Sequence, residues 1–382
     1  MSRVTVQPSL VEWALIRSGL TPEDVQDHLP HIYDWIAGES NPTLRQLEEF
    51  ARITHTPLGY LLLKKPPEEA LPVPYFRTQR DEKVGKPSPD LVETIQTMQR
   101  RQVWIREFLL DEGQDQLDFV GTARREENSA LVAQRIRQRM GLNHGWADEQ
   151  DTWEGALRML RQSVEALGIL IFFNGIVGNN THRKLDPSEF RGFVLVDDYA
   201  PLLFVNAADA KAAQMFTLAH ELAHVFFGSS AVFDLREMRS SDEPTERACN
   251  SVAAQFLVPR DELLDIWPDV SHQREPFRAV ARRFRVSVLV AARRALDLKL
   301  VTRDSFLAFY HEYLKEEHRR TAAQEGGDFY GNQNLRVGHR FASAILRAVK
   351  ERKLLYSEAY RLTDLHGKAF HEYAASIGAG GA

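Results

Sequence analysis

Residues 216–228 read FTLAHELAHVFFG, and this stretch decides the fold and the chemistry that the chain can have. His220, Glu221 and His224 stand in it among apolar residues whose spacing favours a helix. Residues four apart lie on one face of a helix, so the two histidines can offer imidazole nitrogens to a single ion. Glu221 lies about 100° further round, close to a ligand of that ion. The alternative is a pair of core histidines, each satisfied by one hydrogen bond. Burying all three polar groups without partners would cost several kcal/mol, which favours a metal site.

The arrangement His-Glu-x-x-His is typical of zinc hydrolases, in which the metal polarises a water molecule and the glutamate takes its proton. Such a short pattern also recurs by chance, so a third ligand is needed to support it. Glu246 is the preferred candidate because it begins the next predicted helix, TERACNSVAAQFLVP, where small residues allow close packing. Asn250 lies one turn later and could orient Glu246. The rival carboxylates Asp234, Glu237, Asp242 and Glu243 lie in a predicted loop. We therefore expect one Zn²⁺ per chain.

The composition limits the class of protein. Of 382 residues, 43% are hydrophobic and 26% charged, as in ordinary globular chains. The formal net charge of −5 gives no basic field for nucleic acid or an anionic membrane. The single cysteine, Cys249, excludes an intrachain disulfide and a cysteine-based zinc site. With no apolar signal region and no apolar run of membrane-spanning length, we expect a cytoplasmic protein. The oligomeric state cannot be read from the sequence.

Four segments follow one another along the chain. Residues 1–65 carry short amphipathic helices, residues 66–88 form a proline-rich linker, and residues 89–270 combine helices with short strands before FTLAHELAHVFFG. Residues 271–382 are predicted to be a C-terminal helical region. The expected fold class is α+β and mostly helical.

Several blocks of this sequence resemble the ImmA/IrrE zinc metallo-endopeptidases. They are FRGFVLVDDYAPLLFVNAADAKAAQMFTLAHELAHVFFG, ERACNSVAAQFLVP, NPTLRQLEEFARITHTPLGYLLLKKPPEEALPVPYFRT and GDFYGNQNLRVGHRFASAILRAV. The resemblance implies a zincin-like core with a small antiparallel or mixed sheet. It also implies a zinc endopeptidase whose substrate is a helix-turn-helix repressor or another regulatory protein, cleaved in a stress response. His220, His224 and Glu246 match the zinc ligands of that family, and Glu221 matches its catalytic glutamate.

The N-terminal segment resembles an XRE-type helix-turn-helix domain but lacks part of its pattern. Only Pro30 and His31 separate Leu29 from Ile32, where about four more residues would form the turn and the start of a recognition helix. Residues 1–65 also carry six Lys and Arg against eight Asp and Glu, whereas DNA binding needs a basic surface. We therefore expect a degenerate domain for packing or protein recognition, with DNA binding possible but disfavoured.

Three further predictions concern the surroundings of the site. His182, Arg191 and Tyr199 are candidate donors to a developing oxyanion or to substrate. In a zincin-like sheet an edge strand would pair with an extended substrate, and FRGFVLV, residues 190–196, is the candidate for the strand nearest the cleft. Residues 273–301 contain an arginine-rich helix-turn-helix rhythm. Ordinary helix packing is the favoured interpretation there, and contact with an acidic partner or nucleic acid stays open.

Two functions are consistent with these features. The first is a zinc-dependent endopeptidase that cleaves a specific regulatory protein. The alternative is a transcription regulator or antitoxin-like binding protein whose metal site is structural or vestigial.

Overall fold

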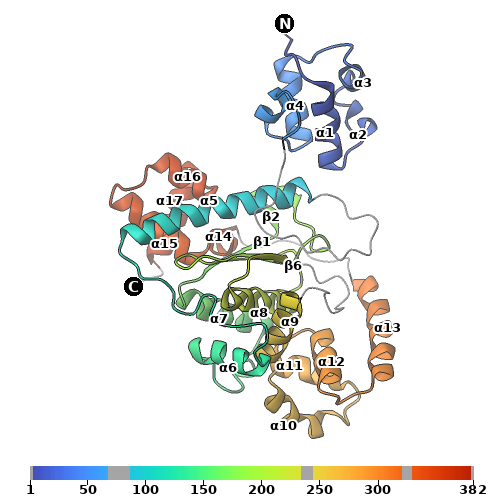
Figure 1. Ribbon diagram of the computed structural model, residues 1–382, viewed down its shortest axis with the longest axis vertical. Coiled ribbons are helices and arrows are strands. Elements are labelled where there is room, and N and C mark those ends of the chain that lie inside the picture. The colour runs from blue at the N-terminus through green and yellow to red at the C-terminus, as the bar shows by residue number, and fades with distance from the viewer. Residues whose placement is uncertain (1–2, 68–86, 234–243, 321–328, 380–382) are drawn as a thin grey trace. The chain divides into compact units, whose positions relative to one another are not determined.

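The computed structural model describes residues 3–67, 87–233, 244–320 and 329–379 (Figure 1). Its contacts divide the chain into two compact units. The first contains the described residues up to 67 together with 87–97, and the second contains the described residues from 98 onward. Helix α5 (Pro89–Asp111) begins in the first unit and continues into the second. Among the described residues, no helix combines the length and the apolar character needed to cross a membrane.

The first unit is a small helical bundle around an aromatic core. Trp35 and Phe50 meet edge to face with their ring centroids 6.2 Å apart. Two of its helices have only five residues each, and the stretch from Ser18 to Leu44 that contains them holds five acids and no Lys or Arg. The helix-turn-helix assignment of this unit stays a prediction. Its elements before α5 are α1 (Pro8–Ser18), α2 (Pro22–Gln26), α3 (Ile32–Ile36), α4 (Leu44–Ile53) and the 3₁₀ helix η1 (Leu58–Leu62).

The second unit is built on a four-stranded mixed sheet in the order β1-β5-β4-β6. Strands β1 and β5 are parallel, and β4 runs antiparallel to both of its neighbours. A separate two-stranded hairpin, β2-β3, follows β1. The strands are β1 (Leu170–Asn174), β2 (Ile176–Val177), β3 (Asn180–Lys184), β4 (Gly192–Leu195), β5 (Leu202–Asn206) and β6 (Ala231–Phe233).

Helices cover both faces of this sheet. Alternate residues of a strand point to opposite faces, so Ile171 and Phe173 join the large core with α7 and α8, while Phe172 meets Phe341 of α15 across the other face. Burial on both faces explains why LIFF and LLFV are continuous apolar runs. The helices are α6 (Ser129–Arg139), α7 (Trp153–Ala166), α8 (Lys211–Phe227), α9 (Pro244–Leu257), α10 (Arg260–Val270), α11 (Pro276–Phe284), α12 (Val288–Asp297), α13 (Arg303–Arg320), α14 (Phe329–Val337), α15 (His339–Lys350), α16 (Tyr356–Thr363) and α17 (Gly367–Ala379).

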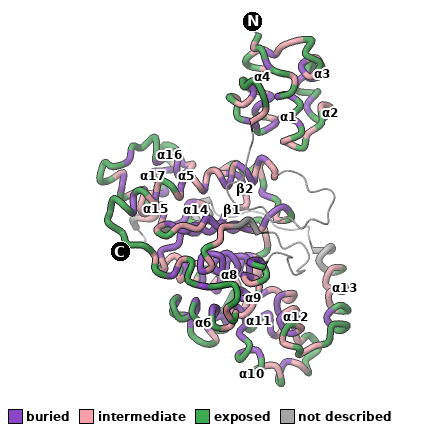
Figure 2. The backbone as a smooth tube through the Cα atoms, viewed as in Figure 1, coloured by how far each residue is buried: buried purple, intermediate pink, exposed green. Residues whose placement is uncertain are grey.

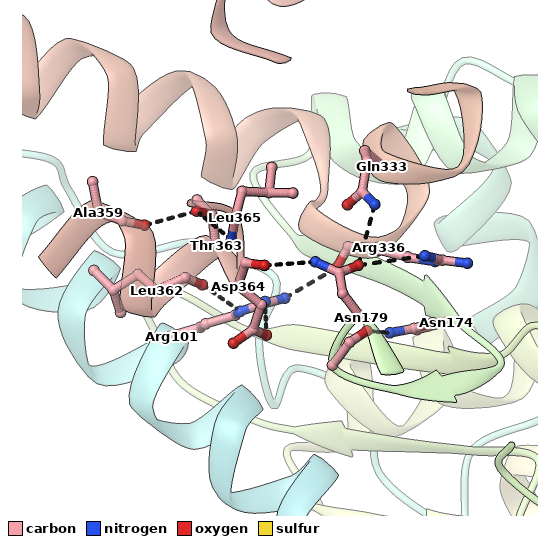
Figure 3. A network of polar contacts seen from close by, with 11 residues as sticks. Arg101, Asn174, Asn179, Gln333, Arg336, Ala359, Leu362, Thr363, Asp364 and Leu365 are labelled. Carbon is pink, nitrogen blue, oxygen red and sulfur yellow. Dashed lines mark hydrogen bonds and ion pairs between the residues drawn. The ribbon is translucent and has the colours of Figure 1, made fainter. Parts of the chain in front are cut away.

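A polar network fastens the C-terminal helices to α5 and to the β2-β3 hairpin (Figure 3). The buried Arg101 guanidinium donates to the carbonyls of Leu362 and Arg336 and pairs with Asp364 at 3.0 Å. The Asn179 side chain donates to the Asp364 carbonyl at 2.7 Å. Because a buried arginine needs such partners, these contacts fix the C-terminal helices against the edge of the sheet at β1.

The predicted fold class, α+β and mostly helical with a small mixed sheet, is confirmed. The predicted domain boundaries stay predictions. The core around the sheet does extend to Ala291, so residues assigned to the C-terminal segment share it. In that segment, Arg283 pairs with Asp148, Arg285 lies over the Trp153 ring, and Arg294 donates to the Val258 carbonyl. These contacts support the packing interpretation of the arginine-rich stretch.

Helix α15 approaches the sheet closely at Gly338, whose backbone lies against β1. Its φ of 75° is left-handed, and a Cβ there would lie 2.6 Å from the Ile171 carbonyl oxygen. We expect Gly338→Ala to destabilise the protein by about 2 kcal/mol or more, because backbone strain adds to overpacking. Gly367 is the matched control, since its φ is 49° but nothing lies within 4 Å of its Cβ position. Equal shifts of the thermal unfolding midpoint in the two variants would contradict this account.

Candidate metal centre

Helix α8 forms the buried centre of the second unit (Figure 2). Every residue from Gln214 to Phe226 is buried, and the side chains of His220, Glu221 and His224 are completely enclosed. The helix ends at Gly228, whose left-handed φ of 68° lets the chain turn away. An apolar helix thus places three polar groups in the core, where each needs a partner.

Helix α9 supplies the third group. Glu246 stands in its first turn and is 4% exposed. Cys249 and Ala253 on the same helix are fully buried, and small residues of this kind allow α9 to lie close to α8. The predicted loop between the helices includes Asp234, Glu237, Asp242 and Glu243, which lie outside the described residues.

The three side chains converge on one point. Glu246 Oε2 lies 3.1 Å from His220 Nε2, and Glu246 Oε1 lies 3.1 Å from His224 Nε2. The two Nε2 atoms are also 3.1 Å apart. A tetrahedral zinc ion with ordinary bond lengths holds its ligands about 3.3–3.4 Å apart. The donor set of two imidazoles and one carboxylate therefore fits zinc in both chemistry and spacing.

The electrostatics favour the ligand forms of these groups. Burial lowers the pKa of His220, which keeps its imidazole neutral. Burial by itself raises the pKa of Glu246, but the neighbouring His220 and His224 side chains outweigh it, so the pKa of Glu246 lies below its usual value. Neutral imidazoles and an ionised carboxylate are the forms that bind a cation.

Asn250 orients one of the ligands. Its Oδ1 lies 3.1 Å from His220 Nδ1. An amide oxygen can only accept, so this contact places the proton on Nδ1 and leaves the Nε2 lone pair facing the other ligands. The sequence predicted that Asn250 would orient Glu246, whereas its side chain contacts His220.

Glu221 is the buried carboxylate beside these ligands. Burial and the nearby charge of Glu246 raise its pKa well above the usual value. Neither of its oxygens has a hydrogen-bond partner among the described residues. An unpaired carboxylate in the core is costly, and such groups mark functional sites more often than structural ones.

The predicted oxyanion or substrate donors are placed less favourably. His182 is exposed on β3. The Arg191 guanidinium faces Asp209 at 3.3 Å, and the Tyr199 ring packs under Arg106 at 5.4 Å. Arg191 and Tyr199 therefore have structural partners, and within the described part of the chain no contact joins any of the three to the ligand set. Their assignment as donors stays a prediction.

The strand predicted to lie nearest the cleft, residues 190–196, does pass beside Glu221, but it is not an edge strand. Strand β4 is paired on both sides, with β5 and with β6. Its outer hydrogen-bonding groups are used by Ala231–Phe233, which follow α8 closely in the chain. Periodicity identified the strand, but its neighbours depend on pairings made only in the folded chain.

Two residues of the site were missed from the sequence. A Cβ on Gly192 of β4 would lie 3.1 Å from Glu221 Oε1 and 2.6 Å from the Thr217 methyl carbon, so β4 passes directly beside both side chains. A glycine inside an apolar strand is a signal of close approach. Thr217 lies four residues before Glu221, and this spacing already places both on one helix face.

Comparison with known families covers part of the chain. Residues 164–296 match the peptidase M78 family model, described as the IrrE N-terminal-like domain. This range holds the sheet, α8 and α9, and therefore all four charged or ligating residues of the centre. Residues 337–376, which hold α15, α16 and most of α17, match a domain of unknown function. No curated protein matches the chain. The first match supports a peptidase of the ImmA/IrrE family in this part of the chain, and that family is typically metal-dependent.

Asn250→Ala should weaken zinc binding by about 10–100-fold, because His220 loses the acceptor that fixes its tautomer and orientation. Asn250→Asp is the matched control, since it keeps an acceptor oxygen and should bind zinc at least as tightly as the wild type. Competition against a chromophoric chelator measures both affinities. Unchanged affinity in the alanine variant would remove Asn250 from the site.

Glu221→Gln should raise the thermal unfolding midpoint of the zinc-free protein, and more at pH 8 than at pH 5. A folded pKa above the unfolded one means that the stability contributed by this group is present at acidic pH and is lost as the pH rises through the folded pKa. The amide cannot ionise and avoids this loss. We expect a gain of about 2–8 °C, from about 1–3 kcal/mol of desolvation.

The control for this prediction is Glu262, which is also buried but pairs with Arg137 at 2.8 Å. Glu262→Gln breaks an ion pair and should lower the midpoint. A lower midpoint for Glu221→Gln at both pH values would show that Glu221 has a stabilising partner.

Proposed function

We propose that this protein is a zinc-dependent endopeptidase that cleaves a specific regulatory protein. One observation carries the proposal: three ligand side chains that approach one another to 3.1 Å stand next to a buried carboxylate without a partner among the described residues. A purely structural metal site needs the ligands but has no use for Glu221. The match of residues 164–296 to a peptidase family supports the same conclusion.

Each side chain has a role in this proposal. His220, His224 and Glu246 would hold the metal and leave a fourth position open. Bound zinc supplies a Lewis acid for the peptide carbonyl and for a water molecule. Glu221 accepts a proton from the water as it attacks the carbonyl carbon, and donates it to the leaving nitrogen as the C–N bond breaks.

A regulatory protein is the proposed substrate for two reasons. The ligand set and Glu221 are nearly inaccessible to solvent, so a general protease substrate would not reach them without a specific rearrangement. The resemblance to repressor-cleaving peptidases points to a helix-turn-helix repressor or similar protein. The acidic stretch from Ser18 to Leu44 would favour a basic protein partner over DNA for the first unit.

The Glu221→Gln variant, loaded with zinc, should bind the substrate without cleaving it and can be used to capture it from cells. Wild-type protein should then cleave the captured partner at a defined bond, and Glu221→Gln should do so about 10²–10⁴-fold more slowly while holding about one zinc per chain. A chelator should stop cleavage and added zinc should restore it. Mass spectrometry of the products measures the reaction.

Glu262→Gln, which alters a buried carboxylate away from the site, should cleave normally and serves as the control. Normal cleavage by Glu221→Gln would contradict the proposed chemistry. An intact partner after incubation with zinc-loaded wild type would favour the alternative function, a binding or regulatory protein with a structural or vestigial metal site.

A further inference from the structure

Thr217 differs from other buried threonines of this protein. The hydroxyls of Thr54, Thr94 and Thr363 each donate to the carbonyl four residues earlier, at 2.6–2.8 Å. This is the ordinary way for a threonine in or at the end of a helix to satisfy its hydroxyl. Thr217 is 1% exposed, and its Oγ1 makes no hydrogen bond to any described residue. The fold therefore buries a hydroxyl that its own helix does not use.

Its position on α8 places it beside Glu221. Residues four apart are neighbours on a helix surface, with about 5–6 Å between their Cβ atoms. Both side chains also lie next to Gly192, whose Cβ position is 2.6 Å from Thr217 Cγ2 and 3.1 Å from Glu221 Oε1. The methyl group of Thr217 thus faces β4 at the same point as the Glu221 carboxylate.

The two side chains also complement each other chemically. A hydroxyl can donate one hydrogen bond, and an ionised carboxylate can only accept. Each is buried without a partner among the described residues, and each such group costs about 1–3 kcal/mol. A rotation of the Glu221 side chain, or one bridging water molecule, would let the hydroxyl donate to the carboxylate.

We propose that Thr217 is a positioning residue for Glu221, whose hydroxyl donates to the carboxylate directly or through one water molecule when the site is loaded. Its methyl group packs against Gly192 and limits the rotation of the side chain. Proton transfer depends strongly on where the carboxylate oxygen lies, so a fixed Glu221 raises the rate of the chemical step. The inference rests on the proposed function, because it assigns Thr217 through the role of Glu221.

A double-mutant cycle tests the contact without a substrate. The thermal unfolding midpoints of four zinc-loaded proteins are compared: wild type, Thr217→Val, Glu221→Met and the double variant. Valine has the shape of threonine without the hydroxyl, and methionine removes the acceptor. We expect Thr217→Val to lower the midpoint when Glu221 is present and to raise it in the Glu221→Met background. The same shift in both backgrounds would overturn the proposal.

A second measurement separates positioning from packing. With the captured substrate, Thr217→Val should lower kcat by about 10–100-fold with KM and zinc content unchanged, and Thr217→Ser should stay within about threefold of wild type. The control, Thr363→Val, removes a buried hydroxyl from α16 and should leave kcat unchanged. Wild-type rates in Thr217→Val, or equal loss in Thr217→Ser, would overturn the role of the hydroxyl. If wild type cleaves no captured protein, the proposed function fails, while the unfolding cycle still decides the contact.

Discussion

Four ionisable side chains are buried together where α8 packs against α9. The contacts around them determine how much free energy their burial costs. Taking charged groups out of water costs several kcal/mol each unless partners compensate. Glu246 lies 3.1 Å from both His220 Nε2 and His224 Nε2, so a cation held by the three side chains would compensate the burial of all of them. Neither oxygen of Glu221 has a hydrogen-bond partner among the described residues. This arrangement, three converging ligand side chains beside a buried carboxylate, is the physical feature from which the proposed function follows.

The surrounding fold keeps the four groups in register. Small and buried residues on α9 bring Glu246 to the histidines, and Asn250 fixes the orientation of His220. On the other side of α8, Gly192 lets β4 pass beside Glu221, where any side chain would collide. The C-terminal helices cover the opposite face and edge of the sheet through the Arg101 network. The positions of the four groups therefore depend also on the C-terminal helices, which pack on the opposite face of the sheet.

The unpaired polar groups of this site lower the free energy of unfolding of the protein. An unpaired buried carboxylate and an unpaired buried hydroxyl both oppose folding, yet both lie where a reaction would use them. Natural proteins commonly accept a loss of stability at functional positions. The same reasoning identifies Thr217, which periodicity alone would assign to the core.

The sequence by itself determined the class of fold, the central helix and the grouping of His220, Glu221 and His224, because helical periodicity and local spacing are properties of neighbouring residues. It also singled out Glu246 through the small residues of its helix. Tertiary structure alone decided the rest. The pairing of β4 on both sides, the approach of Gly192 to Glu221, and the partners taken by Arg191 and Tyr199 join residues distant in the chain. Contacts of that kind depend on how sheets and helices pack, and periodicity carries no information about them.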